Sequence, residues 1–123
     1  MMEIRFYSPA AMNGTAATRH EQEIIVMAPG GMVYGPYCPL EAGDYAVDFA
    51  VALPTGGSVR LDVRAGDAVL AETTAGASGR VTLNFTLDAP IHPVEFRTFN
   101  TGAPGQDAVF FGVTLTRSNA QKG

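Results

Sequence analysis

Two tyrosines, Tyr34 and Tyr37, flank a Gly35-Pro36 step in the segment MVYGPYCPLEAGDYAVDF, residues 32–49. Proline cannot donate a hydrogen bond to a ladder, so a strand through this step is expected to break or to lie at a sheet edge. A broken edge leaves ring faces free to meet a ligand, and a ring face suits the apolar C–H side of a sugar. The two tyrosines therefore predict a sugar-stacking surface. The alternative is that both rings fill the core where a strand changes sheet.

Four polar side chains could complete such a surface by binding sugar hydroxyls. Glu95 and Arg97 alternate outward in the segment VEFRTF, and Asn100 and Asp107 lie in the loop NTGAPGQD that follows. The planar fork of donors on arginine and the acceptor oxygens of a carboxylate match vicinal hydroxyls. In this reading Arg97 forms one polar patch with Glu95 or Asp62. The alternative is that the outward charged residues of the strands form cross-strand ion pairs and that the loop residues are solvated.

The elements that must position these side chains are strands, because apolar residues alternate with period two along most of the chain. Helical periodicity is absent beyond a possible turn near residues 10–20. About nine strands with Gly/Pro turns between them predict an all-β fold in one domain spanning residues 1–123, an antiparallel two-sheet β-sandwich (jelly roll). A closed barrel is the alternative. The expected strands are 3–7, 22–28, 32–38, 44–53, 58–65, 68–73, 80–87, 93–99 and 108–117.

Four of the expected loops carry two glycines each: residues 29–32, 54–58, 74–79 and 100–107. If consecutive strands alternate in direction, these four loops share one end of the sandwich. Glycine permits the close approach of another group, so this end is expected to form a recognition rim beside Tyr34. The alternative is that they are ordinary hairpin loops.

Composition argues against several other classes of function. The net charge is −4, and the eight basic residues are scattered, whereas nucleic-acid binding needs concentrated positive charge. No apolar run is long enough to span a membrane, so membrane insertion is not expected. The N-terminal residues lack the basic-then-apolar order of a secretory signal. This leaves the cytoplasm, a non-classical export route or a removed leader, and the compartment is unknown.

Metal and catalytic motifs are also missing from the sequence. A single cysteine, Cys38, excludes an internal disulfide and a multi-cysteine metal site. The two histidines, His20 and His92, are far apart, and His20 has only Glu21 and Glu23 beside it as oxygen ligands. No nucleophile elbow, HExxH motif or phosphate loop occurs. We therefore expect no cofactor, no metal and no enzymatic activity.

Two aromatic residues suggest contact between subunits. Phe99 and Phe110 flank the loop at residues 100–107 and fall on the solvent-facing phase of their expected strands. Exposed aromatics near a rim predict either a stacking platform or a subunit contact, and we favour a homo-oligomer formed through them. A bulge could instead shift the phase of a strand and bury one of the two rings.

Four segments of the chain resemble β-sandwich modules of the carbohydrate-binding type: YGPYCPLEAGDYAVDF, VRLDVRAGDAVLAE, LNFTLDAPIHPVEFRTF and FFGVTLTR. The modules share a Y-x-x-L-x-A-G-x-Y-x-V opening and a closing GV-x-L strand, and the likeness covers roughly residues 21–117. The chain looks similar to small bacterial lectins and to jelly-roll accessory domains of bacterial glycosyltransferases.

The resemblance implies sugar binding at a loop rim or on a sheet face, commonly through tryptophan or tyrosine. This chain has no tryptophan, which leaves Tyr34 and Tyr37 as the stacking residues. Many such modules carry calcium, but the expected ligands are not recognisable here beyond Glu21 and Glu23.

The sequence thus predicts a lectin that binds a mono- or oligosaccharide without altering it. Weak affinity for a single sugar would favour an oligomer that presents several sites. Two other functions stay open: a structural or assembly module that contacts another protein, and a jelly-roll metal enzyme, which the two separate histidines disfavour. The predicted contacts are Tyr34, Tyr37, Glu95, Arg97, Asn100 and Asp107.

Overall fold

The computed structural model describes residues 2–20 and 24–118, apart from the side chains of residues 2, 16–20 and 92. These segments contain ten strands and one short 3-10 helix, η1 (Pro9–Ala11). None of their helices is long and apolar enough to cross a bilayer. The strands are β1 (Met2–Tyr7), β2 (Asn13–His20), β3 (Ile24–Tyr34), β4 (Pro36–Leu40), β5 (Gly43–Ala52), β6 (Val59–Ala65), β7 (Ala68–Ala75), β8 (Gly79–Leu87), β9 (Ile91–Asn100) and β10 (Ala108–Ser118).

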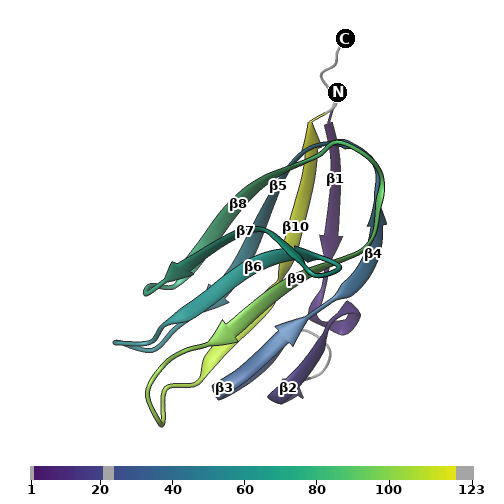
Figure 1. The fold of residues 1–123 in the computed structure, drawn as a ribbon. Helices are drawn as coiled ribbons and strands as arrows, with labels where there is room; N and C mark the ends of the chain where they lie inside the picture. Colours follow the sequence, from purple (N-terminus) through teal and green to yellow (C-terminus); the bar gives the residue numbers. More distant parts are fainter. Residues whose placement is uncertain (1, 21–23, 119–123) are drawn as a thin grey trace.

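The strands form two antiparallel layers, which confirms the predicted sandwich (Figure 1). The first layer has the order β8-β5-β10, with β1 on the other edge of β10. The second has the order β7-β6-β9, with β4 beside β9. Strand β3 belongs to both layers, because residues 25–27 pair with β10 and residues 32–33 pair with β9. Strand β2 pairs along β3.

The core lies between the layers and follows from the period-two pattern. In β5 the inward residues are buried while the residues between them are only half-buried or exposed. Phe49 of this strand meets Phe96 of β9 edge to face, with ring centroids 6.5 Å apart. Tyr45 stacks on Phe85 of β8 at 5.1 Å, and its hydroxyl donates to the Glu41 carbonyl at 2.6 Å. Each large side chain buried in this way stabilises the fold by about 1.5–3 kcal/mol.

Two parts of the strand prediction are wrong. Residues 13–20, where a turn was expected, form β2, whose sequence NGTAATRH lacks regular apolar alternation. Residues 29–32, expected to be a loop, lie within β3, which continues to Tyr34. The pairing of β2 with β3 skips positions between the Thr15–Met32 and Ala17–Met27 pairs, so the glycines at 30 and 31 occupy an irregularity in the ladder rather than a turn.

The prediction that Phe110 faces solvent is also wrong, because β10 contains a bulge. The ladder with β5 shifts between Phe110 and Gly112, so Phe111 becomes the extra residue. Phe110 is consequently 0% exposed, whereas Phe111 is 39% exposed. Gly112 makes the bulge possible, since its φ is +122° and a Cβ there would come within 2.9 Å of the Phe6 ring.

Candidate functional site

An open hollow of about 350 Å³ lies on the outer face of the second layer and brings four of the six predicted contacts together. Tyr34 comes from β3, Tyr37 from β4, and Glu95 and Arg97 from β9. We call it the tyrosine hollow, and its lining residues are Thr15, Met32, Tyr34, Tyr37, Arg64, Glu95 and Arg97.

The Gly35-Pro36 step turns the chain so that both tyrosine rings face this hollow. The peptide bond is cis, and Tyr37 has a φ of +64°, which residues other than glycine seldom adopt. The Gly35 carbonyl accepts a hydrogen bond from the Phe96 amide at 2.6 Å, which ties the step to β9. The rings of Tyr34 and Tyr37 meet edge to face with centroids 6.1 Å apart. Tyr37 is 42% exposed, so its ring is accessible to a ligand.

The Asp62 carboxylate fixes the position of the Arg97 side chain beside the tyrosine hollow. Arg97 Nε and Nη2 donate to the two Asp62 carboxylate oxygens at 2.7 and 2.6 Å. Arg60 Nη1 lies 3.0 Å from the same carboxylate, and its Nη2 pairs with Glu72. The carboxylate is fully buried although it points to the outer face, because these two arginines cover it. Arg97 and Asp62 are directly opposite in the ladder and form a cross-strand ion pair, the kind of contact that the alternative interpretation predicts for these outward charges.

Phe99 completes this network. The Arg60 and Arg97 guanidinium carbons lie 5.2 and 5.0 Å from the centre of its ring, which is cation–π geometry. The guanidinium of Arg97 is therefore held by two charge-assisted hydrogen bonds and one ring face. Among the described residues its Nη1 has no hydrogen-bond partner, so it can donate to a ligand.

Among the described residues, no ion pair joins Arg64 and Glu95, the other two charged residues of the hollow. Arg64 and Glu95 are directly opposite across β6 and β9, but Arg64 Nε donates to the Gly66 carbonyl at 2.6 Å. Desolvation raises the pKa of Tyr37, and the charge of Glu95 and a hydrogen bond to it raise that pKa further. The Tyr37 phenol therefore stays protonated at neutral pH. The lining of the hollow thus contains one carboxylate acceptor, Glu95, and two arginine donors, Arg64 and Arg97.

Asn100 and Asp107 do not line the tyrosine hollow. Asn100 is buried, and its Nδ2 donates to the carbonyls of Met27 and Gln106 at 2.9 and 2.8 Å. Its Oδ1 accepts from the Gly102 amide at 2.8 Å, so the side chain shapes the loop rather than facing solvent. Asp107 is exposed on the same loop, away from the two tyrosines.

Three of the glycine-rich loops do meet at one end of the sandwich. Gln106 Nε2 donates to the Thr55 carbonyl at 3.1 Å, and the Leu53 backbone N–H donates to Ser78 Oγ at 2.7 Å. None of these loops contributes to the tyrosine hollow, so the expected rim beside Tyr34 is wrong: the tyrosines lie on a sheet face. Arg64, which the sequence did not add to the site, joins it through the pairing of β6 with β9, a register that the pattern of either strand alone does not give.

Replacing Asn100 with alanine should lower the free energy of unfolding by about 1–3 kcal/mol, because the buried Met27 carbonyl loses its donor. Urea denaturation of the variant and of the native chain measures this difference. Asp107→Ala, an exposed change on the same loop, is the control and should stay within about 0.5 kcal/mol. Equal stability of Asn100→Ala and native protein would contradict a structural role for Asn100.

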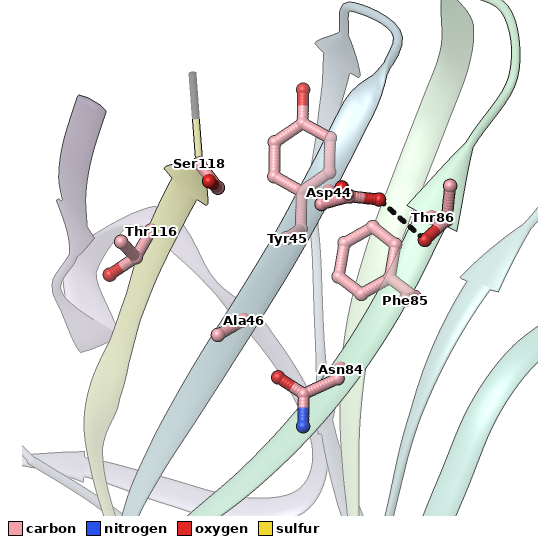
Figure 2. Close-up of a pocket in the computed structure, with 8 residues that line it drawn as sticks. All are labelled: Asp44, Tyr45, Ala46, Asn84, Phe85, Thr86, Thr116 and Ser118. Atoms are coloured by element: carbon pink, nitrogen blue, oxygen red, sulfur yellow. Dashed lines mark hydrogen bonds between the residues drawn. The ribbon is translucent and has the colours of Figure 1, made fainter. Parts of the chain in front are cut away.

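A second hollow, of about 340 Å³, lies on the first layer, across β10, β5 and β8 (Figure 2). We call it the hydroxyl hollow. Ala46 lies between Thr116 and Asn84, and Thr86 donates to Asp44 at 2.8 Å. Its aromatic residues, Tyr45 and Phe85, are buried against each other. This hollow offers polar groups but no accessible ring face among its described lining, which is Asp44, Tyr45, Ala46, Asn84, Phe85, Thr86, Thr116 and Ser118.

The described residues contain no group of three His, Cys, Asp or Glu side chains that could hold a metal ion. The candidates Glu21 and Glu23, and the side chains of His20 and His92, lie outside what the structure describes. Cys38 is half-buried, its thiol contacts the Val94 carbonyl, and burial raises the pKa of that thiol. Cys38 is therefore a packing residue rather than a reactive thiolate.

Comparison with known proteins shows which solved structures share this fold. No protein-family model matches the chain, and no curated protein matches its sequence. Among solved structures, the C-terminal CBM6 module of the laminarinase LamC from Zobellia galactanivorans superimposes with a TM-score of 0.67 at 15% identity, covering 94% of this chain and 100% of the module. The xylan-binding module CBM15 gives a TM-score of 0.65 at 14% identity, covering 94% and 97%.

A third similar structure is a carbohydrate-binding module of lichenase 5A from Cellvibrio mixtus, solved with cellotriose. It gives a TM-score of 0.63 at 13% identity, covering 94% of this chain and 98% of the module. At such low identity these similarities establish the fold. The predicted resemblance to carbohydrate-binding β-sandwich modules is confirmed at that level: this chain has their architecture over nearly its whole length.

Proposed function

We propose that this protein is a non-catalytic carbohydrate-binding module and that sugar binds in the tyrosine hollow. The observation that carries the proposal is the convergence of Tyr34, Tyr37, Glu95 and Arg97 in one open hollow on a sheet face. The structurally similar modules support it, since their own descriptions name polysaccharide-degrading enzymes and bound oligosaccharides.

The geometry supports a division of roles. The accessible ring of Tyr37, braced edge to face by Tyr34, would take the apolar C–H face of a sugar ring. Glu95 would accept from sugar hydroxyls and Arg97 Nη1 would donate to them. Because Asp62 already fixes the Arg97 guanidinium, binding would order fewer side chains and lose less entropy.

The hollow does not resemble a hydrolytic site. Among its described lining residues, Glu95 is the one carboxylate, whereas glycoside hydrolysis normally uses a pair flanking the bond to be cleaved. A binding role without turnover is the simpler reading of this residue set. Incubation with an oligosaccharide that binds should accordingly leave it uncleaved.

Removing the Tyr37 ring should weaken sugar binding about tenfold, which corresponds to about 1.4 kcal/mol of lost stacking and contact area. A glycan array would identify a ligand, and titration calorimetry would compare native protein, Tyr34→Ala and Tyr37→Gly. Glycine accepts a φ of +64° without strain, so Tyr37→Gly should unfold at the same temperature as native protein or higher. A selective loss of binding in a stable variant would therefore report the ring itself.

Asn84→Ala in the hydroxyl hollow is the matched control, and it should bind like the native chain. If no carbohydrate binds on the array or in calorimetry, the proposed function is wrong. If binding survives Tyr37→Gly and is lost in Asn84→Ala, the function stands and the ligand occupies the other face.

A further inference from the structure

Strand β1 combines an open edge with an exposed apolar face. It pairs with β10 from residue 2 to residue 7, and among the described residues no strand pairs with its other side. Ile4 and Phe6 are 66% and 62% exposed, the highest values of any large hydrophobic side chains in the described segments. The strand has no proline and no bulge against β10, two devices that proteins use to block such an edge.

We propose that β1 pairs antiparallel with β1 of a second copy of this chain, about a two-fold axis that passes at Ile4. The first layers of the two copies would then join into one continuous sheet. A symmetric pairing of this kind satisfies the open backbone groups of both edges at once. It is independent of the sugar-binding proposal, because the tyrosine hollow lies on the second layer.

Among two-fold axes at Glu3, Ile4 and Arg5, the charges on β1 favour the axis at Ile4. Side chains directly opposite each other in a ladder lie on the same face of the sheet. In the joined sheet, Ile4 and Phe6 of both copies therefore lie on one face, and Glu3 and Arg5 of both copies lie on the other. An axis at Glu3 or at Arg5 places two like charges directly opposite, which destabilises the pair. An axis at Ile4 places Glu3 opposite Arg5 of the partner subunit, twice, with both signs matched.

The apolar face is arranged for such a contact. The Phe6 ring packs against Gly112 of its own sheet, where a Cβ would come within 2.9 Å of the ring. Glu3 keeps its bond from Arg117 Nη1, at 2.9 Å, on the side facing its own sheet. It can accept from Arg5 of the partner subunit on the other side. Arg5 of each copy also hydrogen-bonds the Tyr7 side chain of its own strand, so its guanidinium would share its five donors between Tyr7 and Glu3 of the partner subunit.

Self-association should depend on the face of β1 and not on apolar surface in general. Sedimentation equilibrium over micromolar to millimolar concentrations should find a dimer for the native chain and a folded monomer for Ile4→Lys and Phe6→Lys. Val69→Lys is the control, because Val69 on β7 is 45% exposed but far along the sheet order from β1, and this variant should stay dimeric. A native monomer at every concentration, or a dimer that survives Ile4→Lys, overturns the proposal.

The register is testable by disulfide trapping in a Cys38→Ser background. At the axis, Cα atoms of opposite residues are about 4.5 or 5.5 Å apart, within the range that a disulfide spans. Ile4→Cys should therefore form a covalent dimer on mild oxidation. Phe6→Cys should not, since it would lie four residues, about 14 Å, from its copy along the partner strand. A covalent dimer from Phe6→Cys and none from Ile4→Cys would exclude the axis at Ile4.

Reversing charges adds a third test. Glu3→Lys alone should weaken the dimer, because it puts like charges opposite one another across the axis. Adding Arg5→Glu restores opposite signs and should recover association, even though the bond to Arg117 is lost. Recovery supports the pairing of these two positions, and a double variant weaker than the single one contradicts it.

Discussion

Replacing Phe110 with alanine is expected to lower the free energy of unfolding by about 3–5 kcal/mol. The ring is fully buried where β10 touches both of its neighbours, opposite Ile25 of β3 and Val51 of β5. Truncation there would remove apolar contacts and leave a cavity that the two flanking strands cannot close. Urea denaturation followed by circular dichroism measures the loss.

The adjacent residue provides the control. Phe111→Ala removes the same atoms at the next position, but this side chain is 39% exposed, so the loss should be below about 1 kcal/mol. The opposite ranking of the two variants, or equal losses, would mean that β10 has no bulge between Phe110 and Gly112. The result also separates a core role for Phe110 from a role in subunit contact.

Replacing Asp62 with alanine should cost about 3–5 kcal/mol of stability, the loss typical of a buried ion pair that loses one partner. The change would leave Arg97 and Arg60 without the carboxylate that both contact. Arg97 is itself largely covered, so its charge would be poorly solvated. We expect the loss to change little with salt, because buried pairs are weakly screened.

Asp67→Ala tests the same chemistry at the surface. Asp67 is fully exposed and lies 3.7 Å from Arg64, so its removal should change the free energy of unfolding by less than about 1 kcal/mol. If Asp62→Ala were as mild as Asp67→Ala, the Asp62 carboxylate would not be the anchor of Arg97. The fixed guanidinium that the sugar-binding proposal uses would then lose its basis.

The fold could be predicted from the sequence where each strand carries its own alternating pattern, as β5 and β8 do. The fold could not be predicted where a segment becomes a strand because of the strand that it pairs with. The residues of β2 are mostly small or polar, and the segment is a strand because it hydrogen-bonds along β3. The bulge at Phe111 reverses the phase within one strand, and counting back from the regular end of β10 places Phe110 on the wrong side.

The lining of the tyrosine hollow was predictable in its residue types more than in its location. Tyr34 and Tyr37 were identified from the Gly35-Pro36 step, which does turn both rings to one surface. Asn100 shows why the location could not be predicted. A polar residue in a loop sequence is expected to be solvated, but this side chain is buried and makes three hydrogen bonds to backbone groups. The pairing of each outward arginine with a carboxylate depends on the register between neighbouring strands. The residue pattern of a single strand does not give that register.

Strand β3 has a consequence for how the domain opens. Since its two halves are hydrogen-bonded to different layers, the layers cannot separate without breaking the hydrogen bonds of β3 to one of them. Loss of structure should therefore be cooperative across the whole sandwich. Native-state hydrogen exchange would then show the amides of β10 and β9 protected to the same free energy, as one unit rather than two.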